Sequence, residues 1–417
     1  MFYSNTYSDV AKALQAMEPQ ITFWNMKNIP EMLAKGSQLI WDGKKEYLDI
    51  AIEKDDLASI VYTSGTTGKS KGVMLTHFNF SSCAHGACCN VLNTGPVLLI
   101  LPLHHTFGLV ASVLSVMYSG NPVYINRSLK RLADDFQKCK PQLMFVVPMI
   151  LETLYKTIWT TAKKQGKDKA LQVLVKVGDI LLKCGIDLRK YLFKSVLASL
   201  GGKLDIIVSG GAPLDEKYVK AFRSFGITVL NGYGITECGP VVAVNRNKFA
   251  VPGSVGIPLC CNEVRIASDG EILVKGSNVM AGYYRNDAEN EKSFVDGWFR
   301  TGDLGYIDKY GALHITGRVK NLIILGNGEN IPAESIEQQV YTIPYVKEVV
   351  AYGQDDVIVA EVFLDADVPN AKKRIYDDIK AINQKLPLVR NIGKVVIRDT
   401  EFPKTTTKKI KRNCGGQ

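Results

Sequence analysis

The residues whose types and spacing suggest chemistry begin with a loop of glycines and hydroxyls, Tyr-Thr-Ser-Gly-Thr-Thr-Gly-Lys-Ser-Lys-Gly, at positions 62–72. An apolar run precedes the loop and a helical pattern begins at about Phe78, so the loop is predicted to follow a buried strand. Glycines let the backbone approach a ligand closely, and hydroxyls add donors to exposed N–H groups. We therefore predict that this loop binds phosphate.

Two common nucleotide-binding patterns do not fit the chain. The Walker loop has four residues between its first glycine and Gly-Lys-Ser, but Gly65 and Gly68 are separated by two, and Thr63 stands where the first glycine would fall. The dinucleotide pattern GxGxxG fails at positions 232–237 because Glu237 replaces its third glycine. Both classes are therefore disfavoured.

A second segment with chemical potential is Asn-Gly-Tyr-Gly-Ile-Thr-Glu-Cys-Gly-Pro, at positions 231–240. Tyr233, between two glycines, offers a stacking face for adenine. Thr236 can donate to a phosphate oxygen, and Glu237 can hold Mg²⁺ through a hard oxygen ligand. This segment is therefore predicted to take part in nucleotide and metal binding.

The loop at 62–72, with its continuation Lys71-Gly72-Val73 and with Thr76-His77, resembles the signature loop of the adenylate-forming (AMP-binding) superfamily. That superfamily includes acyl-CoA synthetases, luciferases and the adenylation domains of peptide synthetases. Segments 101–108, 209–215, 229–240 and 328–334 look most like long-chain fatty acyl-CoA synthetases, and the likeness covers nearly all of residues 55–412. It implies that ATP, with Mg²⁺, activates a fatty acid to acyl-AMP, which then forms a thioester with coenzyme A.

The resemblance also implies a role for each matching position. The ATP-binding residues would be Thr63, Ser64, Gly65, Thr66, Thr67, Gly68, Lys71, Gly210, Gly211, Ala212, Asn231, Gly232, Tyr233, Gly234, Thr236, Asp303 and Arg318. The catalytic residues would be Lys409, His105 and Thr236. His105 and Asn330 would face the acyl carboxylate, Glu237 and Thr63 would hold the metal, and Lys320 would be the hinge.

Some of these positions have simpler interpretations or depart from the family pattern. Asp303 in a glycine turn is otherwise a turn former, and Lys409 otherwise belongs to a basic tail. Lys408 stands where relatives usually have glycine, which costs roughly 1 to 2 kcal/mol if the site needs a positive φ. Many relatives have an acidic residue where this chain has Asn321, which leaves the charge partner at the hinge open.

The predicted fold class is α/β. Apolar runs that alternate with helical stretches up to about residue 230 indicate βαβ units and a mainly parallel sheet flanked by helices. We predict a large N-terminal domain at 1–317 with a β-rich subdomain at about 241–317. A small, mobile α+β domain at 318–417 would follow and carry the catalytic lysine. Family members have a longer segment before the signature loop, so we expect the N-terminal part of the family to be missing.

Composition bounds the partners. The net charge is +10, which suits ATP, CoA or peripheral contact with an acidic membrane surface. No nucleic-acid-binding module accompanies the charge, and no stable protein partner is implied. The nine cysteines show no CxxC pair and no metal-like spacing, so we expect reduced thiols in a cytoplasmic protein. Two alternatives stay open: transfer to a carrier-protein thiol, and a truncated nucleotide-binding remnant without turnover.

Overall fold

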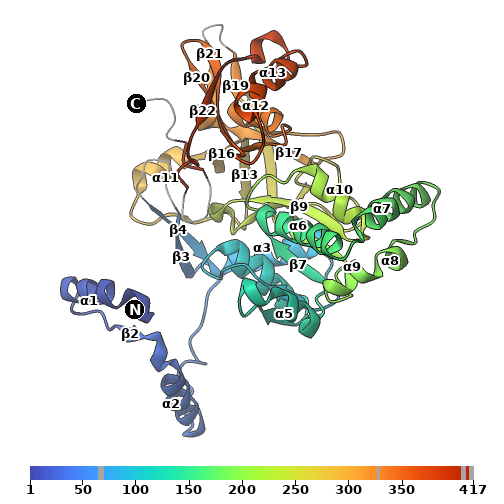
Figure 1. Ribbon diagram of the computed structural model, residues 1–417. Helices are drawn as coiled ribbons and strands as arrows, with labels where there is room; N and C mark the ends of the chain where they lie inside the picture. Colours follow the sequence, from blue (N-terminus) through green and yellow to red (C-terminus); the bar gives the residue numbers. More distant parts are fainter. Residues whose placement is uncertain (64–69, 326–328, 405–409, 413–417) are drawn as a thin grey trace. The chain divides into compact units, whose positions relative to one another are not determined.

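The computed structural model describes residues 1–63, 70–325, 329–404 and 410–412, and its contacts divide the chain into two units (Figure 1). The first unit is Met1–Lys54. Its strands β1 (Phe2–Tyr3) and β2 (Trp24–Asn25) pair in parallel, and its helices are α1 (Ser8–Met17) and α2 (Ile29–Trp41). Within residues 1–54, all of which the structure describes, Ala11 alone is buried. The sequence did not lead us to expect this separate unit.

The second unit, Asp55–Gln417, is built around a seven-stranded sheet in the order β11-β10-β9-β8-β7-β5-β6. The five strands at one side run parallel, as predicted: β6 (Val123–Ile125), β5 (Val97–Leu99), β7 (Leu143–Val146), β8 (Ile206–Ser209) and β9 (Thr228–Gly234). Strands β10 (Val241–Val244) and β11 (Ile257–Pro258) extend it in antiparallel orientation.

Both faces of this sheet are buried, because successive residues of its strands enter two different cores. In β7, Leu143 and Phe145 belong to one core, whereas Met144 and Val146 belong to the other. The first core includes residues of α3 (His77–Asn90) and of the π-helical segment η3 (Phe107–Leu114). Residues of α5 (Leu132–Cys139), α6 (Pro148–Lys164), α7 (Asp168–Lys183), α9 (Lys194–Ser199) and α10 (Glu216–Ser224) fill the second. Helices therefore flank both faces, as predicted.

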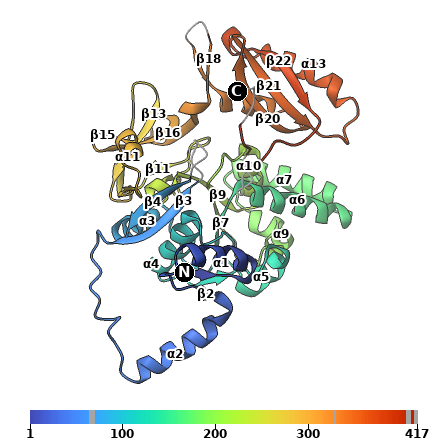
Figure 2. The ribbon, with the colours of Figure 1, turned by 90° about the vertical axis from the view of Figure 1, so that its left-hand side faces the viewer.

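The strands on either side of the signature loop form a separate antiparallel pair (Figure 2). Strand β3 (Leu57–Thr63) pairs with β4 (Lys71–Thr76), and β14 (Gly282–Tyr283) pairs with the other edge of β4. The alternating pattern had suggested a parallel sheet from residue 57 onward. A parallel crossover needs about a dozen residues or more, and the connection here is too short for one.

A second β-rich layer contains β12 (Asn262–Ile266), β13 (Glu271–Gly276), β15 (Phe294–Val295), β16 (Trp298–Ile307) and β17 (Leu313–Arg318). All of their pairings are antiparallel. This layer corresponds to most of the predicted β-rich subdomain, although β10 belongs to the seven-stranded sheet instead. Helix α11 (Asp287–Ser293) lies between β14 and β15 in the sequence.

The C-terminal part has a core of its own, drawn in orange and red in Figure 1. Its strands are the hairpin β18 (Leu322–Ile324) and β19 (Asn330–Pro332) and the sheet β20 (Val346–Gln354), β21 (Val357–Leu364) and β22 (Ile392–Arg398). Its helices are α12 (Ala333–Val340) and α13 (Ala371–Asn383). A separate core and a mixed composition agree with the α+β class, whereas the boundary at residue 317 and the mobility of this part stay predictions.

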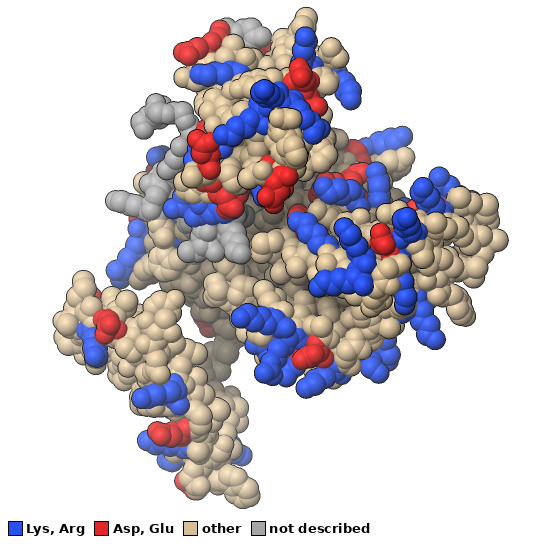
Figure 3. All heavy atoms as spheres, viewed as in Figure 1, with Lys and Arg blue, Asp and Glu red and all other residues tan. Residues whose placement is uncertain are grey.

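Basic side chains are spread over the face seen in Figure 3, with acidic side chains between them. On this face the positive charge does not gather into one patch. Among the residues that the structure describes, none of the helices combines the length and the apolar character needed to cross a bilayer.

Candidate active site

Two segments singled out in the sequence meet at one edge of the seven-stranded sheet. Strands β8 and β9 are parallel neighbours, and Ser209 pairs with Asn231 at their carboxyl ends. Gly210 and Gly211 follow β8 directly, and Tyr233 lies near the end of β9. Ligands of open α/β sheets bind beyond the carboxyl ends of the strands. The fold therefore places both segments where such a ligand would lie.

The glycines around Tyr233 allow close packing of the backbone. A Cβ atom on Gly234 would lie 1.9 Å from the carbonyl oxygen of Pro240, so no larger residue fits without movement of the chain. At Gly210, a Cβ atom would lie 3.1 Å from the ring of Phe107. Gly234 therefore needs to be glycine for space, whereas at Gly210 a larger residue would require the Phe107 ring to move by a few tenths of an ångström.

Tyr233, Asp303 and Arg318 form one connected group. The Tyr233 hydroxyl donates to Oδ2 of Asp303 at 2.7 Å, and Nε of Arg318 donates to the other carboxylate oxygen. Asp303 and Arg318 are cross-strand partners on β16 and β17, and Asp303 is only 6% exposed. Burial, and then the charge of Asp303, raise the pKa of Tyr233 well above its ordinary value, so its hydroxyl remains a donor.

A second group joins the signature loop's flank to Glu237. Glu237 lies in the 3₁₀ turn η5 (Thr236–Cys238), and its Oε1 accepts a hydrogen bond of 3.0 Å from the Tyr283 hydroxyl. Lys71 lies with its Nζ 5.1 Å from the Tyr283 ring centroid and forms an ion pair with Glu289. Burial, and then the charge of Glu237, raise the pKa of Tyr283. The second group therefore contains two carboxylates, those of Glu237 and Glu289, and one lysine, Lys71.

The residues predicted to hold Mg²⁺ supply oxygen atoms, which is the donor type that this ion prefers. Glu237 offers a carboxylate, and Thr63, at the end of β3, offers a hydroxyl that donates to the carbonyl oxygen of Lys71 at 3.5 Å. Strand β4 packs against η5, which brings the flank of the signature loop to Glu237. Both donors are of the type that magnesium takes, and their role as its ligands stays a prediction.

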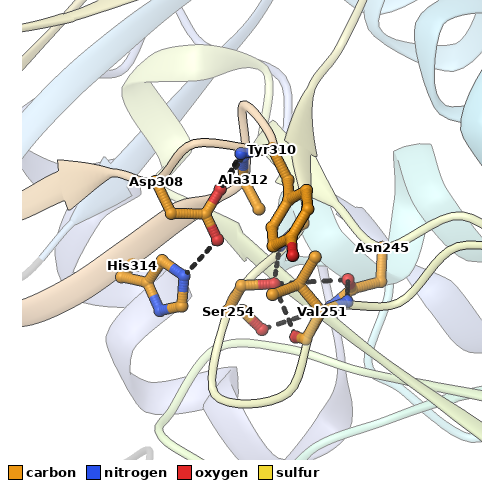
Figure 4. Close-up of polar contacts among 8 residues, drawn as sticks. Asn245, Val251, Ser254, Asp308, Tyr310, Ala312 and His314 are labelled. Atoms are coloured by element: carbon orange, nitrogen blue, oxygen red, sulfur yellow. Dashed lines mark hydrogen bonds and ion pairs between the residues drawn. The ribbon is translucent and has the colours of Figure 1, made fainter.

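Two small hydrogen-bonded turns lie next to each other, one after β10 and one between β16 and β17 (Figure 4). In the first, Asn245 accepts from the Val251 N–H and from the Ser254 hydroxyl, while its own N–H donates to the carbonyl of Asn231. In the second, Asp308 accepts from the Ala312 N–H and bonds His314.

Backbone hydrogen bonds join these two turns to each other. The Val255 N–H donates to the carbonyl of Leu313, and the Leu313 N–H donates to that of Gly256, each at 2.8 Å. The strand pair that carries Asp303 and Arg318 is thereby held against the strand that carries Tyr233. Tyr233 and Asp303, which are 70 positions apart in the sequence, are in contact in this packed arrangement.

An apolar cavity opens beside this site. Its volume is about 80 Å³, and it opens to solvent. The cavity is walled by α3, η3 and the ends of β7, β8 and β9, through Ala87, Cys88, Val91, Asn93, Phe107, Ala111, Ser115, Val116, Ser119, Phe145, Val208, Gly210, Gly211, Gly232, Tyr233, Gly234, Pro240, Val241 and Val244. None of these lining residues is charged. The cavity reaches Tyr233 and so adjoins the Tyr233–Asp303 pair.

Comparison with protein families identifies the scaffold, because the family described as AMP-binding enzyme matches residues 8–284. The chain belongs to this family. Among solved structures, it is similar to o-succinylbenzoate CoA synthetase (MenE) from Bacillus subtilis in complex with its acyl-adenylate intermediate. That likeness has a TM-score of 0.68 at 27% identity and covers 87% of this chain and 69% of the other. The same Bacillus protein has been solved with ATP and a magnesium ion.

Curated relatives of this AMP-binding enzyme include two kinds of CoA ligase. Long-chain-fatty-acid–CoA ligase FadD15 of Mycobacterium tuberculosis is 34% identical over 320 residues, which cover 73% of this chain and 53% of that protein. The 2-succinylbenzoate–CoA ligase of Listeria monocytogenes (strain EGD-e) is 34% identical over 372 residues, which cover 85% of this chain and 69% of that protein. The chain thus spans about half the length of the fatty-acid ligase.

The remaining predicted site residues lie in different surroundings. His105 is exposed, and its ring packs on that of His104 with the centroids 4.2 Å apart. Asn330 begins β19 and is also exposed. Thr236 begins η5, next to Glu237, and Ala212 follows Gly211 in the turn after β8. Ser64, Gly65, Thr66, Thr67, Gly68, Lys408 and Lys409 lie outside the described residues.

The predicted hinge lies in the 3₁₀ turn η6 (Val319–Asn321). Burial, and then the charges of Arg318 and Arg412, lower the pKa of Lys320. The side-chain amide of Asn321 donates to Glu334, which also lies 3.4 Å from Arg412. Where many relatives carry an acidic side chain, this chain therefore has the Asn321 amide, which donates to the Glu334 carboxylate.

Sequence reasoning missed three residues of the site. Phe107 lines the cavity and contacts the position of Gly210, although only His105 was chosen from that segment. Tyr283 and Glu289 contact Lys71, but they lie more than 200 positions away from it. The aromatic character of Phe107 was a usable signal. For Tyr283 and Glu289 no local pattern pointed to the loop.

Proposed function

We propose that this AMP-binding enzyme uses ATP to convert a long-chain fatty acid to acyl-AMP and pyrophosphate, and then transfers the acyl group to the thiol of coenzyme A. The observation that carries the proposal is the uncharged cavity that ends at Tyr233. An acyl chain in this cavity would have its carboxylate directed toward the nucleotide side of the site. The relatives with CoA-ligase names support the same reaction class.

The proposed reaction needs positioning and charge neutralisation more than proton transfer. A carboxylate and the α-phosphate of ATP repel each other, so the protein must hold them in line and offset their charge. The Tyr233 ring would stack on adenine, because its hydroxyl is anchored to Asp303 and its ring lines the cavity. Asp303 would accept the ribose hydroxyls. A magnesium ion, held by Glu237 and Thr63, would offset phosphate charge.

The cavity lining favours a fatty acid over succinylbenzoate. Succinylbenzoate has a second carboxylate, which would lie away from the reacting one and need a cation or several donors. Among the residues that the structure describes, the lining offers no Lys, Arg or His, and its polar side chains are those of Asn93, Ser115, Ser119 and Tyr233 with the Cys88 thiol. Burying an unpaired carboxylate among apolar groups is costly. An alkyl chain meets no such penalty.

The substrate proposal is tested by ATP–pyrophosphate exchange with fatty acids of increasing length and with 2-succinylbenzoate. Exchange should be strongest with the long fatty acids. Ala87→Leu, which fills part of the cavity, should shift the preference to shorter acids. Ala84→Leu, in the same helix at a buried position outside the cavity lining, should leave the preference unchanged. Exchange with 2-succinylbenzoate alone would refute the fatty-acid assignment.

The role proposed for Lys409 is tested by separating the two half reactions. Lys409→Ala should lose adenylation, since the lysine would bridge the carboxylate and the α-phosphate, and should still convert supplied acyl-AMP to acyl-CoA. Removal of one such donor typically costs about 3 to 4 kcal/mol in the transition state. Loss of both half reactions in a folded variant would contradict the role. If the acyl group were transferred to a phosphopantetheinyl protein but not to free CoA, the acceptor would be a carrier-protein thiol instead of coenzyme A.

A further inference from the structure

One cluster of chemically active side chains lies outside the proposed active site. His85 and Cys89, four residues apart on α3, come together with Cys260, which lies in the connection between β11 and β12. Their ligand atoms, one imidazole nitrogen and two sulfurs, all lie within 4.8 Å of one another. All three residues are exposed, and both cysteines are free thiols. The sequence showed no metal-like spacing because the third member comes from a distant segment.

The close approach of the two segments depends on a glycine in α3. A Cβ atom on Gly86 would lie 3.0 Å from Sγ of Cys261 and 3.1 Å from Cβ of Leu259. The side chains of Leu259 and Cys261 therefore pack directly against the helix at Gly86, beside the cluster. This contact holds Cys260 near one face of the helix. His85 and Cys89 lie together on a helix face because they are four residues apart.

The distances fit a tetrahedral ion. Zinc binds sulfur at about 2.3 Å and imidazole nitrogen at about 2.0 to 2.1 Å, which places a sulfur and a nitrogen ligand about 3.6 Å apart. Nε2 of His85 lies 3.7 Å from Sγ of Cys89. The sulfur of Cys260 lies within 4.8 Å of both of these atoms.

The other nitrogen of His85 is held as in known metal sites. Nδ1 of His85 lies 2.9 Å from the Tyr118 hydroxyl, and the two rings meet edge to face with centroids 5.5 Å apart. A histidine that ligates a metal through one ring nitrogen usually forms a hydrogen bond through the other, which fixes the ring orientation. Tyr118 therefore orients Nε2 toward the two thiols.

We propose that His85, Cys89 and Cys260 form a zinc site with three protein ligands and a fourth position open to water. Thiolate and imidazole groups bind zinc in preference to magnesium, whereas Glu237 offers oxygen donors that suit magnesium. The two sites are therefore chemically distinct. The same helix lines the apolar cavity through Ala87 and Cys88. A bound ion would thus fasten a wall of the cavity to the connection at 259–261.

The test is a zinc titration of the full-length chain, kept reduced with a non-thiol reductant, with bound metal measured after dialysis. We expect one equivalent of bound zinc per chain, which is lost when the thiols of the cluster are removed. Cobalt in place of zinc should give the sulfur-to-metal charge-transfer absorption of thiolate ligands. Cys260→Ser and His85→Gln should each lose this equivalent. Cys184→Ser, at an exposed thiol outside the cluster, should retain it. Tyr118→Phe should weaken binding by about 10- to 100-fold.

Several results would overturn the proposal. Zinc uptake that survives Cys260→Ser, or that disappears in Cys184→Ser, would place the ion elsewhere. Absence of uptake by the reduced, folded chain would remove the site. If the chain purified without reductant then showed a Cys89–Cys260 disulfide by mass spectrometry, the cluster would be a redox pair instead. None of these readouts depends on the ligase activity, so they are independent of the proposed function.

Discussion

Substitution of Gly234 by alanine tests the packing that places Tyr233. The added methyl group would lie 1.9 Å from the carbonyl oxygen of Pro240 and 2.9 Å from the Cα atom of Val241. These are backbone atoms, so relief requires β9 and β10 to separate. Forcing extra carbon into a packed site typically costs about 1 to 3 kcal/mol. We expect Gly234→Ala to lower the free energy of unfolding by at least that amount.

Gly232→Ala is the matched control for this substitution. Gly232 lies on the same strand and the same face as Gly234, but its Cβ atom would make an ordinary contact of 3.4 Å with Val244. Because alanine restricts the unfolded chain more than glycine, this variant should be neutral or gain up to about 1 kcal/mol.

Urea unfolding of the two variants, followed by circular dichroism and by tyrosine fluorescence, measures the difference. Gly234→Ala should also weaken ATP binding in calorimetry, since Tyr233 would move with the strand. Equal midpoints for Gly234→Ala and Gly232→Ala would refute the argument that close backbone packing at residue 234 positions the ring.

Three further outcomes are expected. Tyr233→Phe removes a hydrogen bond to the buried Asp303 carboxylate and should lower the free energy of unfolding by about 1.5 to 3 kcal/mol. It should impair ATP binding less than Tyr233→Ala does, because the phenyl ring still stacks on adenine. Equal losses of ATP affinity in the two variants would argue against stacking. Glu289→Gln removes the ion-pair partner of Lys71 and should tighten ATP binding by up to about fivefold. Glu291→Gln, at an exposed position of the same helix, should leave ATP affinity unchanged. An unchanged dissociation constant for Glu289→Gln in calorimetry would show that Lys71 does not contact phosphate. The His314 ring and the N–H groups of Ala312 and Tyr310 hold the pKa of Asp308 below its ordinary value. Asp308 therefore stabilises the fold above the unfolded pKa of about 3.9 and loses this contribution as pH falls through its lower folded pKa. The stability difference between the parent chain and Asp308→Asn should be full at pH 6 and should shrink at pH 3, and a difference independent of pH would contradict it.

Local sequence patterns predicted much of the scaffold. Apolar runs such as the one at 143–147 predicted strands, and the residues at the carboxyl ends of β8 and β9 could be chosen as site residues from their glycines and Tyr233. These features depend on periodicity and on turn residues within a few positions, so they can be read along the chain. The antiparallel pairing of β3 with β4 was not predicted from the alternating pattern, because the length of the intervening loop decided it.

Contacts between distant segments were decided by the tertiary structure. The sequence predicted that Tyr233 and Asp303 bind a nucleotide, and this stays a prediction. Their hydrogen bond depends on how β9 and β16 pack in the fold. Cys260 likewise meets α3 because Gly86 permits close packing. Side-chain type is a property of each residue and is visible in the sequence. Proximity across 70 or more positions arises only when whole strands and helices pack, and for that the folded chain is required.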